Sequence, residues 1–161
     1  MLKPPSNLIA CKPYHLLYLC ERMRDDEIEQ YMAFVPIEYF DPDECAIRFM
    51  TYPGPKFTVI GKDGFPACAG GYHEVLPGVW QSWMVGSCEG WKDGWRSITK
   101  GSRWLIQELF LMGARRVQTN ALASRTKTHE WYERGLGLKL EGVWCKYGLQ
   151  GQDVVNYART A

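Results

Sequence analysis

The sequence lacks an excess of charge of either sign and lacks long apolar runs. Nineteen Lys and Arg residues against eighteen Asp and Glu residues leave a formal net charge of +1, which argues against a chain that coats nucleic acid or an anionic membrane. The opening stretch MLKPPSNLIACK has no apolar run or small-residue cleavage site, so neither a signal peptide nor a membrane span is predicted. No repeat, linker or low-complexity segment divides the 161 residues, so residues 1–161 are predicted to form a single domain.

Histidine is scarce, and the cysteines are scattered. Only three His accompany the six Cys, and no C-x-x-C pair occurs, so the clustered ligands that a zinc site needs are missing and no metal is predicted. Cysteines inside apolar segments such as PACAGG favour buried, reduced thiols, although their number also permits disulfides. We therefore expect a reducing, cytoplasmic location.

Aromatic residues, in contrast, are abundant. Seven Trp and nine Tyr indicate either a core rich in rings or rings that line a groove or a partner surface. The composition leaves both readings open.

The N-terminal half is predicted to hold one short strand, then helices, then further strands. Asp41 at an N-cap, Pro42 at the first helical position and Glu44 indicate a helix start. The strand over 79–87 is apolar on both faces, which is typical of a central strand. The full prediction for this half is an extended strand over 8–12, helices over 13–23, 24–34 and 42–50, then strands over 57–60, 65–75 and 79–87 with KDG and LPG as turns.

In the C-terminal half, strands and helices alternate. A strand–helix–strand crossover implies a parallel pair, whereas hairpins imply antiparallel pairs. We therefore predict a mixed α/β fold with a twisted, mostly antiparallel sheet of about six to seven strands and helices on both faces. The predicted elements are a glycine-containing loop over 88–95, a long helix over 96–112, a strand over 115–122, a helix over 124–134 capped by Ser124, and strands over 138–147 and 153–159.

The closing segment WYERGLGLKLEGVW…DVVNYAR, with this element order, resembles the GNAT-type acyl-CoA N-acyltransferases over about residues 9–159. In that superfamily a helix ending in Tyr-Glu-Lys-x-Gly-Phe leads into a strand that starts near Glu-Gly. The resemblance implies a GNAT-like fold with a parallel central pair that splays after Met84. It also implies transfer of an acetyl group from acetyl-CoA to an amine acceptor. The matching residues are Tyr132, Glu133, Arg134, Gly137 and Leu138, with Gly135 as one inserted residue.

The family signature for the CoA diphosphate is Q/R-x-x-G-x-G/A at the start of the long helix, where small residues let backbone N–H groups approach phosphate. Arg96 and Gly101 fit this pattern, and Thr99 replaces the middle glycine. The alternative is that this stretch simply begins a helix. The resemblance implies cofactor binding by Arg96, Thr99, Lys100, Gly101 and Ser102, with backbone amides of Met84 and Val85 holding the thioester carbonyl and the pantetheine arm.

The acid and the base of the reaction have different candidates. Tyr132 matches the family tyrosine that protonates the leaving thiolate, although a tyrosine packed on the sheet is the plain alternative. The base is open among Glu74 and His73, on the strand before the central one, and Glu89 and Asp93, in the loop after it. Glu74 is the preferred candidate, since a loop carboxylate is typically solvated and His73 is expected to be exposed or satisfied at a strand end. Gln81 and Ser82 stand where related enzymes often hold a carboxylate, and neither can act as a strong base.

The segments ERMRDDEIEQ, KDGFPACAGGY, VWQSWMVGS and KGSRWLIQE are also similar to the GNAT-like proteins of tailed phages, including small internal virion proteins. This resemblance implies an alternative function: a catalytically degenerate GNAT-fold component with a structural or host-interaction role. Its partners would be virion proteins or a second copy of the chain, and its location the host cytoplasm or the virion. A nucleic-acid module fits the charge balance least.

Overall fold

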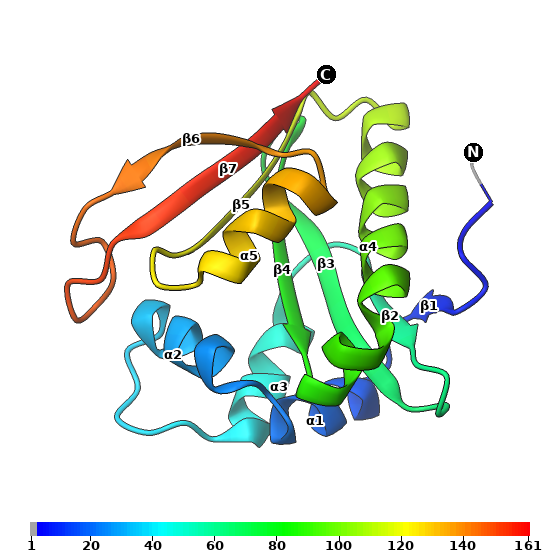
Figure 1. The fold of residues 1–161 in the computed structure, drawn as a ribbon, viewed down its shortest axis with the longest axis horizontal. Helices are drawn as coiled ribbons and strands as arrows, with labels where there is room; N and C mark the ends of the chain where they lie inside the picture. The colour runs from blue at the N-terminus through cyan, green and yellow to red at the C-terminus, as the bar shows by residue number, and fades with distance from the viewer. Residues whose placement is uncertain (1–2) are drawn as a thin grey trace.

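The computed structural model describes residues 3–161, which form one seven-stranded sheet with helices on both faces (Figure 1). The strand order is β1-β2-β3-β4-β5-β7-β6, and β4–β5 is the parallel pair in an otherwise antiparallel sheet. The predicted mixed, mostly antiparallel sheet is therefore confirmed. The strands are β1 (Leu8–Ala10), β2 (Lys56–Ile60), β3 (Pro66–Leu76), β4 (Val79–Gly86), β5 (Arg116–Leu122), β6 (Lys139–Trp144) and β7 (Val154–Thr160).

The helices divide between the two faces. Three of them pack over β3 and β4 on one face, around Leu19, Phe49 and Val85. The others pack over β3, β5 and β7 on the opposite face, around Ile106 and Tyr157. Figure 1 shows α4 and α5 crossing in front of the sheet and α1 to α3 grouped at the lower end of the view. The helices are α1 (Pro13–Glu21), α2 (Asp25–Phe34), α3 (Pro42–Thr51), α4 (Cys88–Leu111) and α5 (Thr126–Glu130), which continues into a π-helical turn, η1 (Trp131–Gly135).

Helix α4 begins at Cys88, so the predicted loop over 88–95 is wrong. Ser87 forms the N-cap, because its Oγ accepts a hydrogen bond from the N–H of Gly90 at 2.9 Å. Gly90 also lies against β3, since a Cβ there would come within 2.2 Å of the carbonyl oxygen of Ala67. This glycine permits close helix–sheet packing rather than a loop.

The start of α5 also differs from the prediction. The N-cap position is Arg125 rather than Ser124, and it makes no side-chain capping bond. The cap predicted at Asp41 is confirmed, because its Oδ1 accepts from the N–H of Glu44 at 2.9 Å.

The inserted glycine of the closing motif lies in η1. The N–H of Leu136 donates to the carbonyl of Trp131 at 3.0 Å, five residues back, which is the bond of a π-helix. The Trp131 ring lies over Gly135, where a Cβ would come within 2.5 Å of the ring. The extra residue therefore widens one turn of helix without displacing the strand that follows.

The central strands part, as predicted, but earlier than predicted. β4 and β5 pair at three positions, ending at Gln81 with Gln118. Beyond this point β4 stays paired with β3 up to Gly86, and β5 stays paired with β7 up to Leu122. The divergence begins after Gln81 rather than after Met84.

None of the six cysteines, all within the described residues, forms a disulfide. No helix in residues 3–161 is long and apolar enough to cross a membrane.

Candidate functional site

The space between the diverging strands is a cavity of about 540 Å³, here called the gap cavity. Aromatic side chains from both faces of the sheet line it, so part of the aromatic content serves a cavity rather than only the core. Tyr31, Phe49, Tyr52 and Trp83 contribute from the α1–α3 face, and Trp91, Trp131 and Tyr132 from the α4–α5 face.

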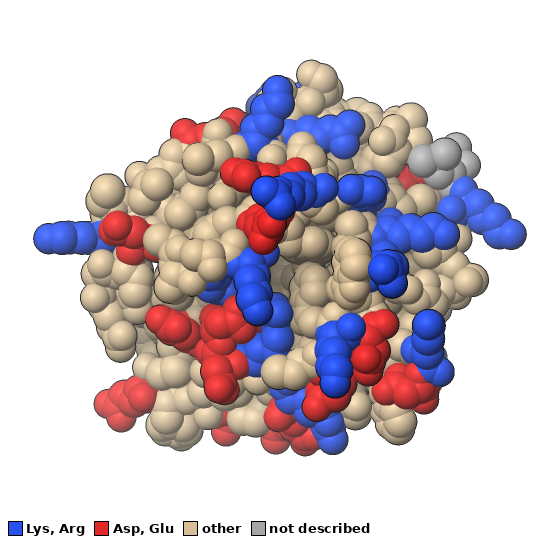
Figure 2. All heavy atoms as spheres, viewed as in Figure 1, with Lys and Arg blue, Asp and Glu red and all other residues tan. Residues whose placement is uncertain are grey.

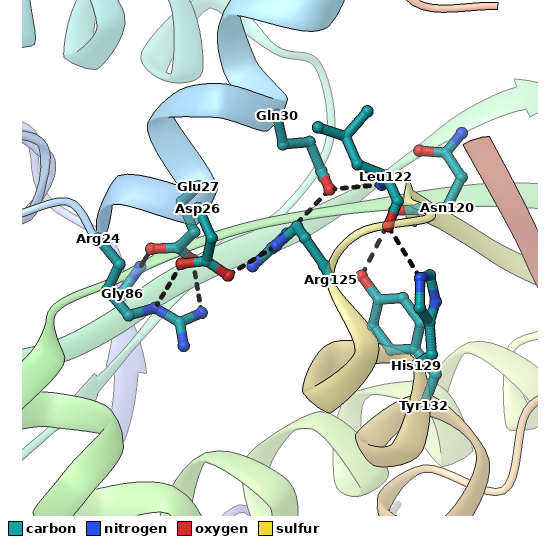
Figure 3. Close-up of polar contacts among 10 residues, drawn as sticks. All are labelled: Arg24, Asp26, Glu27, Gln30, Gly86, Asn120, Leu122, Arg125, His129 and Tyr132. Atoms are coloured by element: carbon teal, nitrogen blue, oxygen red, sulfur yellow. Dashed lines mark hydrogen bonds and ion pairs between the residues drawn. The ribbon is translucent and has the colours of Figure 1, made fainter. Parts of the chain in front are cut away.

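Polar side chains of α2 reach the separated end of β5 (Figure 3). Arg125 donates from Nε to Oδ2 of Asp26 at 2.8 Å and from Nη1 to Oε1 of Gln30 at 2.9 Å. The same Gln30 oxygen accepts from the N–H of Leu122 at 3.1 Å. These contacts replace the strand pairing that β5 loses where β4 departs.

On the β4 side, the start of α2 provides an ion pair between the half-buried N-cap residue Arg24 and the buried Glu27 (Figure 3). Oε1 of Glu27 lies 3.2 Å from Nη2 of Arg24, and Oε2 accepts from the N–H of Gly86 at 3.3 Å. The Arg24 guanidinium stacks over the Trp91 ring at 4.8 Å. Burial raises the pKa of Glu27, and the Arg24 charge opposes that rise. Helix α2 thus bridges both strand ends.

Sequence reasoning missed this role of α2. The available signal was the spacing of Asp26, Glu27 and Gln30, which places three polar groups on adjacent positions of one helical surface.

The backbone of β4 directs alternate amides into the gap. The N–H of Ser87 donates to a carbonyl of β3 at 3.3 Å, whereas the N–H of Gly86 points to Glu27 on the gap side. Because successive peptide groups of a strand face opposite edges, the N–H of Met84 faces the gap and that of Val85 faces β3. Of the two amides predicted to hold a thioester, the geometry directs Met84 into the cavity.

Tyr132 lies buried in the gap cavity beside β5. Its hydroxyl donates to the carbonyl of Asn120 at 3.4 Å and accepts from Oγ1 of Thr119 at 3.5 Å, both at the long limit for hydrogen bonds. Burial raises the pKa of Tyr132, so the phenol stays protonated at neutral pH and can donate its proton.

The segment predicted to bind phosphate lies inside α4, not at its N-terminus. Its backbone N–H groups therefore belong to the helical ladder, so the expectation that this segment begins the helix is wrong. The binding of phosphate by these residues stays a prediction. A Cβ at Gly101 would lie 3.4 Å from Leu8 and from Val59, so this glycine packs on the sheet side of the helix. Gly101 and Ser102 line the gap cavity.

Side chains of the same segment line a second cavity of about 690 Å³ between α4 and η1, here called the basic groove. Figure 2 shows Lys and Arg side chains on both sides of a hollow in this face. The hydroxyl of Thr99 donates to the carbonyl of Trp95 at 2.7 Å and accepts from Nε1 of Trp131 at 2.9 Å, so it ties α4 to η1. The groove and the gap cavity share Trp95, Lys127 and Trp131. The cations of the groove are Arg96, Lys100, Arg103, Lys127 and Arg134, beside one acid, Glu130.

The predicted base, Glu74, lies outside these cavities. Its Oε1 accepts from the N–H of Gly78 at 2.6 Å and so stabilises the β3–β4 hairpin. Its neighbour His73 lines the gap cavity, near the Tyr52 ring at 5.7 Å, with a buried Nδ1 that has no hydrogen-bond partner. Burial lowers the pKa of His73, which favours the neutral imidazole that a base requires.

Comparison with known proteins identifies the fold. No protein-family model matches the sequence, and no curated protein matches it. Among solved structures, a GNAT-family acetyltransferase from Bacillus anthracis matches with a TM-score of 0.73 and 16% identity, over 99% of this chain and 97% of that one. A phosphinothricin acetyltransferase from Sinorhizobium meliloti in complex with acetyl-CoA matches with a TM-score of 0.68 and 15% identity, over 95% and 86% of the two chains. A ribosomal L7/L12 alpha-N-protein acetyltransferase in complex with coenzyme A matches with a TM-score of 0.72 and 13% identity, over 98% and 96%.

The chain therefore has the GNAT fold, as the sequence predicted. The similarity to phage proteins stays a prediction.

Proposed function

We propose that the protein is an acyl-CoA-dependent N-acetyltransferase that transfers an acetyl group from acetyl-CoA to an amine. The observation that carries the proposal is the gap cavity between β4 and β5, which side chains line from both faces of the sheet. A cavity of this form lets a donor and an acceptor meet inside the sheet from opposite sides. The solved acetyltransferases that share this fold include two in complex with acetyl-CoA or coenzyme A.

Residues of this chain suit acetyl-CoA, with side-chain charges in place of the free backbone amides that the family signature implies. The phosphates of CoA suit the basic groove, where Arg96 and Lys100 offer exposed side-chain charge in place of amides at a helix N-terminus. Thr99 supports the groove wall through its two hydrogen bonds. The Met84 N–H facing the gap suits the pantetheine arm and the thioester carbonyl, as a preorganised donor.

Acetyl-CoA would supply the activated acetyl group, and residues of this chain would handle the protons. Tyr132 would donate its phenolic proton to the departing sulfur. Its hydrogen bond to the carbonyl of Asn120 is long, so the hydroxyl can easily give it up for one to the sulfur. His73 takes the place predicted for Glu74 and accepts the proton of the attacking amine. His73 of β3 is the cross-strand partner of Gln81 of β4, and Gln81 is the last residue of β4 that pairs with β5.

A thermal-shift assay with acetyl-CoA tests the binding step. Ligand at 100 times its Kd stabilises the native state by about 2.7 kcal/mol, which corresponds to roughly 5–10 °C for a chain of this size. A transfer assay that follows release of the CoA thiol tests the reaction with amines.

Charge reversal at Lys100 tests the basic groove. A unit charge near phosphate in water contributes about 1 kcal/mol, so Lys100→Glu is expected to weaken acetyl-CoA binding by roughly 30-fold at low salt. The matched control is Lys62→Glu, which makes the same change on an exposed turn outside the groove. Equal affinities of the two variants would remove the groove from the proposal.

The alternative, a catalytically degenerate virion component, is tested by the same assay. Such a protein would show no thermal shift with acetyl-CoA and would co-purify with virion proteins from infected cells.

A further inference from the structure

A third cavity, of about 230 Å³, lies between β4, β5, β6 and β7 and is here called the polar recess. Val117 of β5 packs under α4, so Arg116 and Gln118, which alternate with it, point to the opposite face of the sheet. The recess shares Gln81, Gln118 and Thr119 with the gap cavity. It therefore adjoins the gap on the side away from the basic groove.

A hydrogen-bond chain in the recess has a fixed direction. Arg116 can only donate, so Oε1 of Gln118 must face its Nε, at 2.6 Å. The amide nitrogen of Gln118 then donates to Oε1 of Gln81 at 3.1 Å. The amide nitrogen of Gln81 is left to donate to the carbonyl of Ser82 at 3.3 Å, with one N–H to spare. Both oxygens of Glu141 accept from Arg116, which holds the guanidinium in place.

Two side-chain amides in the lining of the recess have donors without a partner. Gln81 uses one of its two N–H groups on Ser82, and Nδ2 of Asn156 is buried without a hydrogen-bond partner. A buried donor without a partner destabilises the folded protein, and a hydrogen bond to a ligand oxygen would recover that free energy. The carboxylate of Glu141 is hydrogen-bonded to Arg116, and this hydrogen bond holds the pKa of the Glu141 carboxyl below its usual range. The recess therefore favours a ligand oxygen, which accepts hydrogen bonds, over an ammonium group of the ligand, which can only donate them.

From this arrangement we infer that the polar recess binds a carbonyl or carboxylate oxygen of the amine acceptor. The acceptor is then an α-amino acid or its amide, free or as a peptide N-terminus, and not a polyamine or a simple alkylamine. This inference rests on the proposed acetyltransferase function and specifies its substrate class.

The test compares two acceptors of similar size, alaninamide and 2-aminopropane, which differ by the carbamoyl group. With acetyl-CoA as donor, the wild-type protein is expected to show a kcat/KM for alaninamide that is at least about tenfold higher than for 2-aminopropane. A roughly tenfold difference corresponds to the contribution of one well-placed hydrogen bond. Spermidine serves as a third acceptor and is expected to be as poor as 2-aminopropane.

The variant Gln118→Glu reverses the polarity of the chain with almost no change in shape. The new carboxylate still accepts from Arg116, but its other oxygen faces Gln81, so Gln81 must turn its nitrogen toward it and its carbonyl oxygen toward the recess. The preference for alaninamide is expected to fall by about tenfold, while the thermal shift with acetyl-CoA stays. The control Gln150→Glu adds the same charge at an exposed turn and is expected to keep the preference.

Equal kcat/KM for alaninamide and 2-aminopropane, or a preference that survives Gln118→Glu, would overturn the recess assignment and leave the acetyltransferase proposal standing. Absence of any acetyl-CoA shift or transfer would overturn both.

Discussion

Two glycines of α4 should respond oppositely to the same substitution, because their surroundings differ. At Gly101 a Cβ would meet side-chain carbons of Leu8 and Val59 at 3.4 Å, which is ordinary contact. Replacing a helical glycine by alanine stabilises by about 0.5–1 kcal/mol. At Gly90 the Cβ would lie 2.2 Å from a backbone oxygen and 2.6 Å from the Cα of Ala67. The helix would have to move off β3, at a cost of about 1–3 kcal/mol.

Thermal unfolding of both variants provides the measurement. For a chain of this size, about 1 kcal/mol corresponds to roughly 2–4 °C, so Gly101→Ala is expected to raise the midpoint by about 1–4 °C. Gly90→Ala is expected to lower it by roughly 2–12 °C. The urea midpoint should move in the same directions with an unchanged slope.

The same pair tests the assignment of phosphate binding. If Gly101 serves packing alone, Gly101→Ala keeps the affinity for acetyl-CoA. A tenfold loss of affinity without a loss of stability would refute this reasoning and return Gly101 to the phosphate site. A stable Gly90→Ala variant would refute the packing of α4 on β3.

Two further predictions concern the gap. Tyr132→Phe removes a hydroxyl whose hydrogen bonds to Asn120 and Thr119 are long, so the free energy of unfolding should change by less than about 1 kcal/mol. The kcat should fall roughly 100-fold, because the general acid is lost. An unchanged kcat would exclude Tyr132 as the acid. Burial alone would raise the pKa of Asp26, but the hydrogen bond and charge of Arg125 lower it below its ordinary value. The Asp26 carboxylate therefore contributes stability that is present above about pH 4 and lost as the pH falls further. The stability difference between wild type and Asp26→Asn in urea unfolding should shrink over that range; a constant difference down to pH 2 would contradict the linkage.

Local signals predicted much of the fold. Apolar alternation located the strands, and the Asp41-Pro42 start of α3 carries its own cap, so these features depend on residues that are close in sequence. The strand–helix–strand order indicated the parallel pair β4–β5, since that crossover has few alternatives. The closing motif with Tyr132 indicated the GNAT fold.

The errors have a common cause in contacts between distant segments. Gly90 resembles a loop glycine in sequence, and only the proximity of Ala67 on β3 shows that it allows close packing inside a helix. The contact between Arg125 and Asp26 joins residues 99 positions apart, so the local spacing of polar residues in α2 indicates a polar helix surface but not its contacts with β4 and β5. Glu74 has the right chemistry for a base, but its hairpin contact with Gly78 directs it elsewhere.

The gap cavity has a kinetic consequence for the proposed transfer, because side chains from both faces of the sheet line it. If the donor and the acceptor enter it from opposite faces, neither has to leave before the other arrives. The proposed reaction should then proceed through a ternary complex, with intersecting rather than parallel lines in double-reciprocal plots.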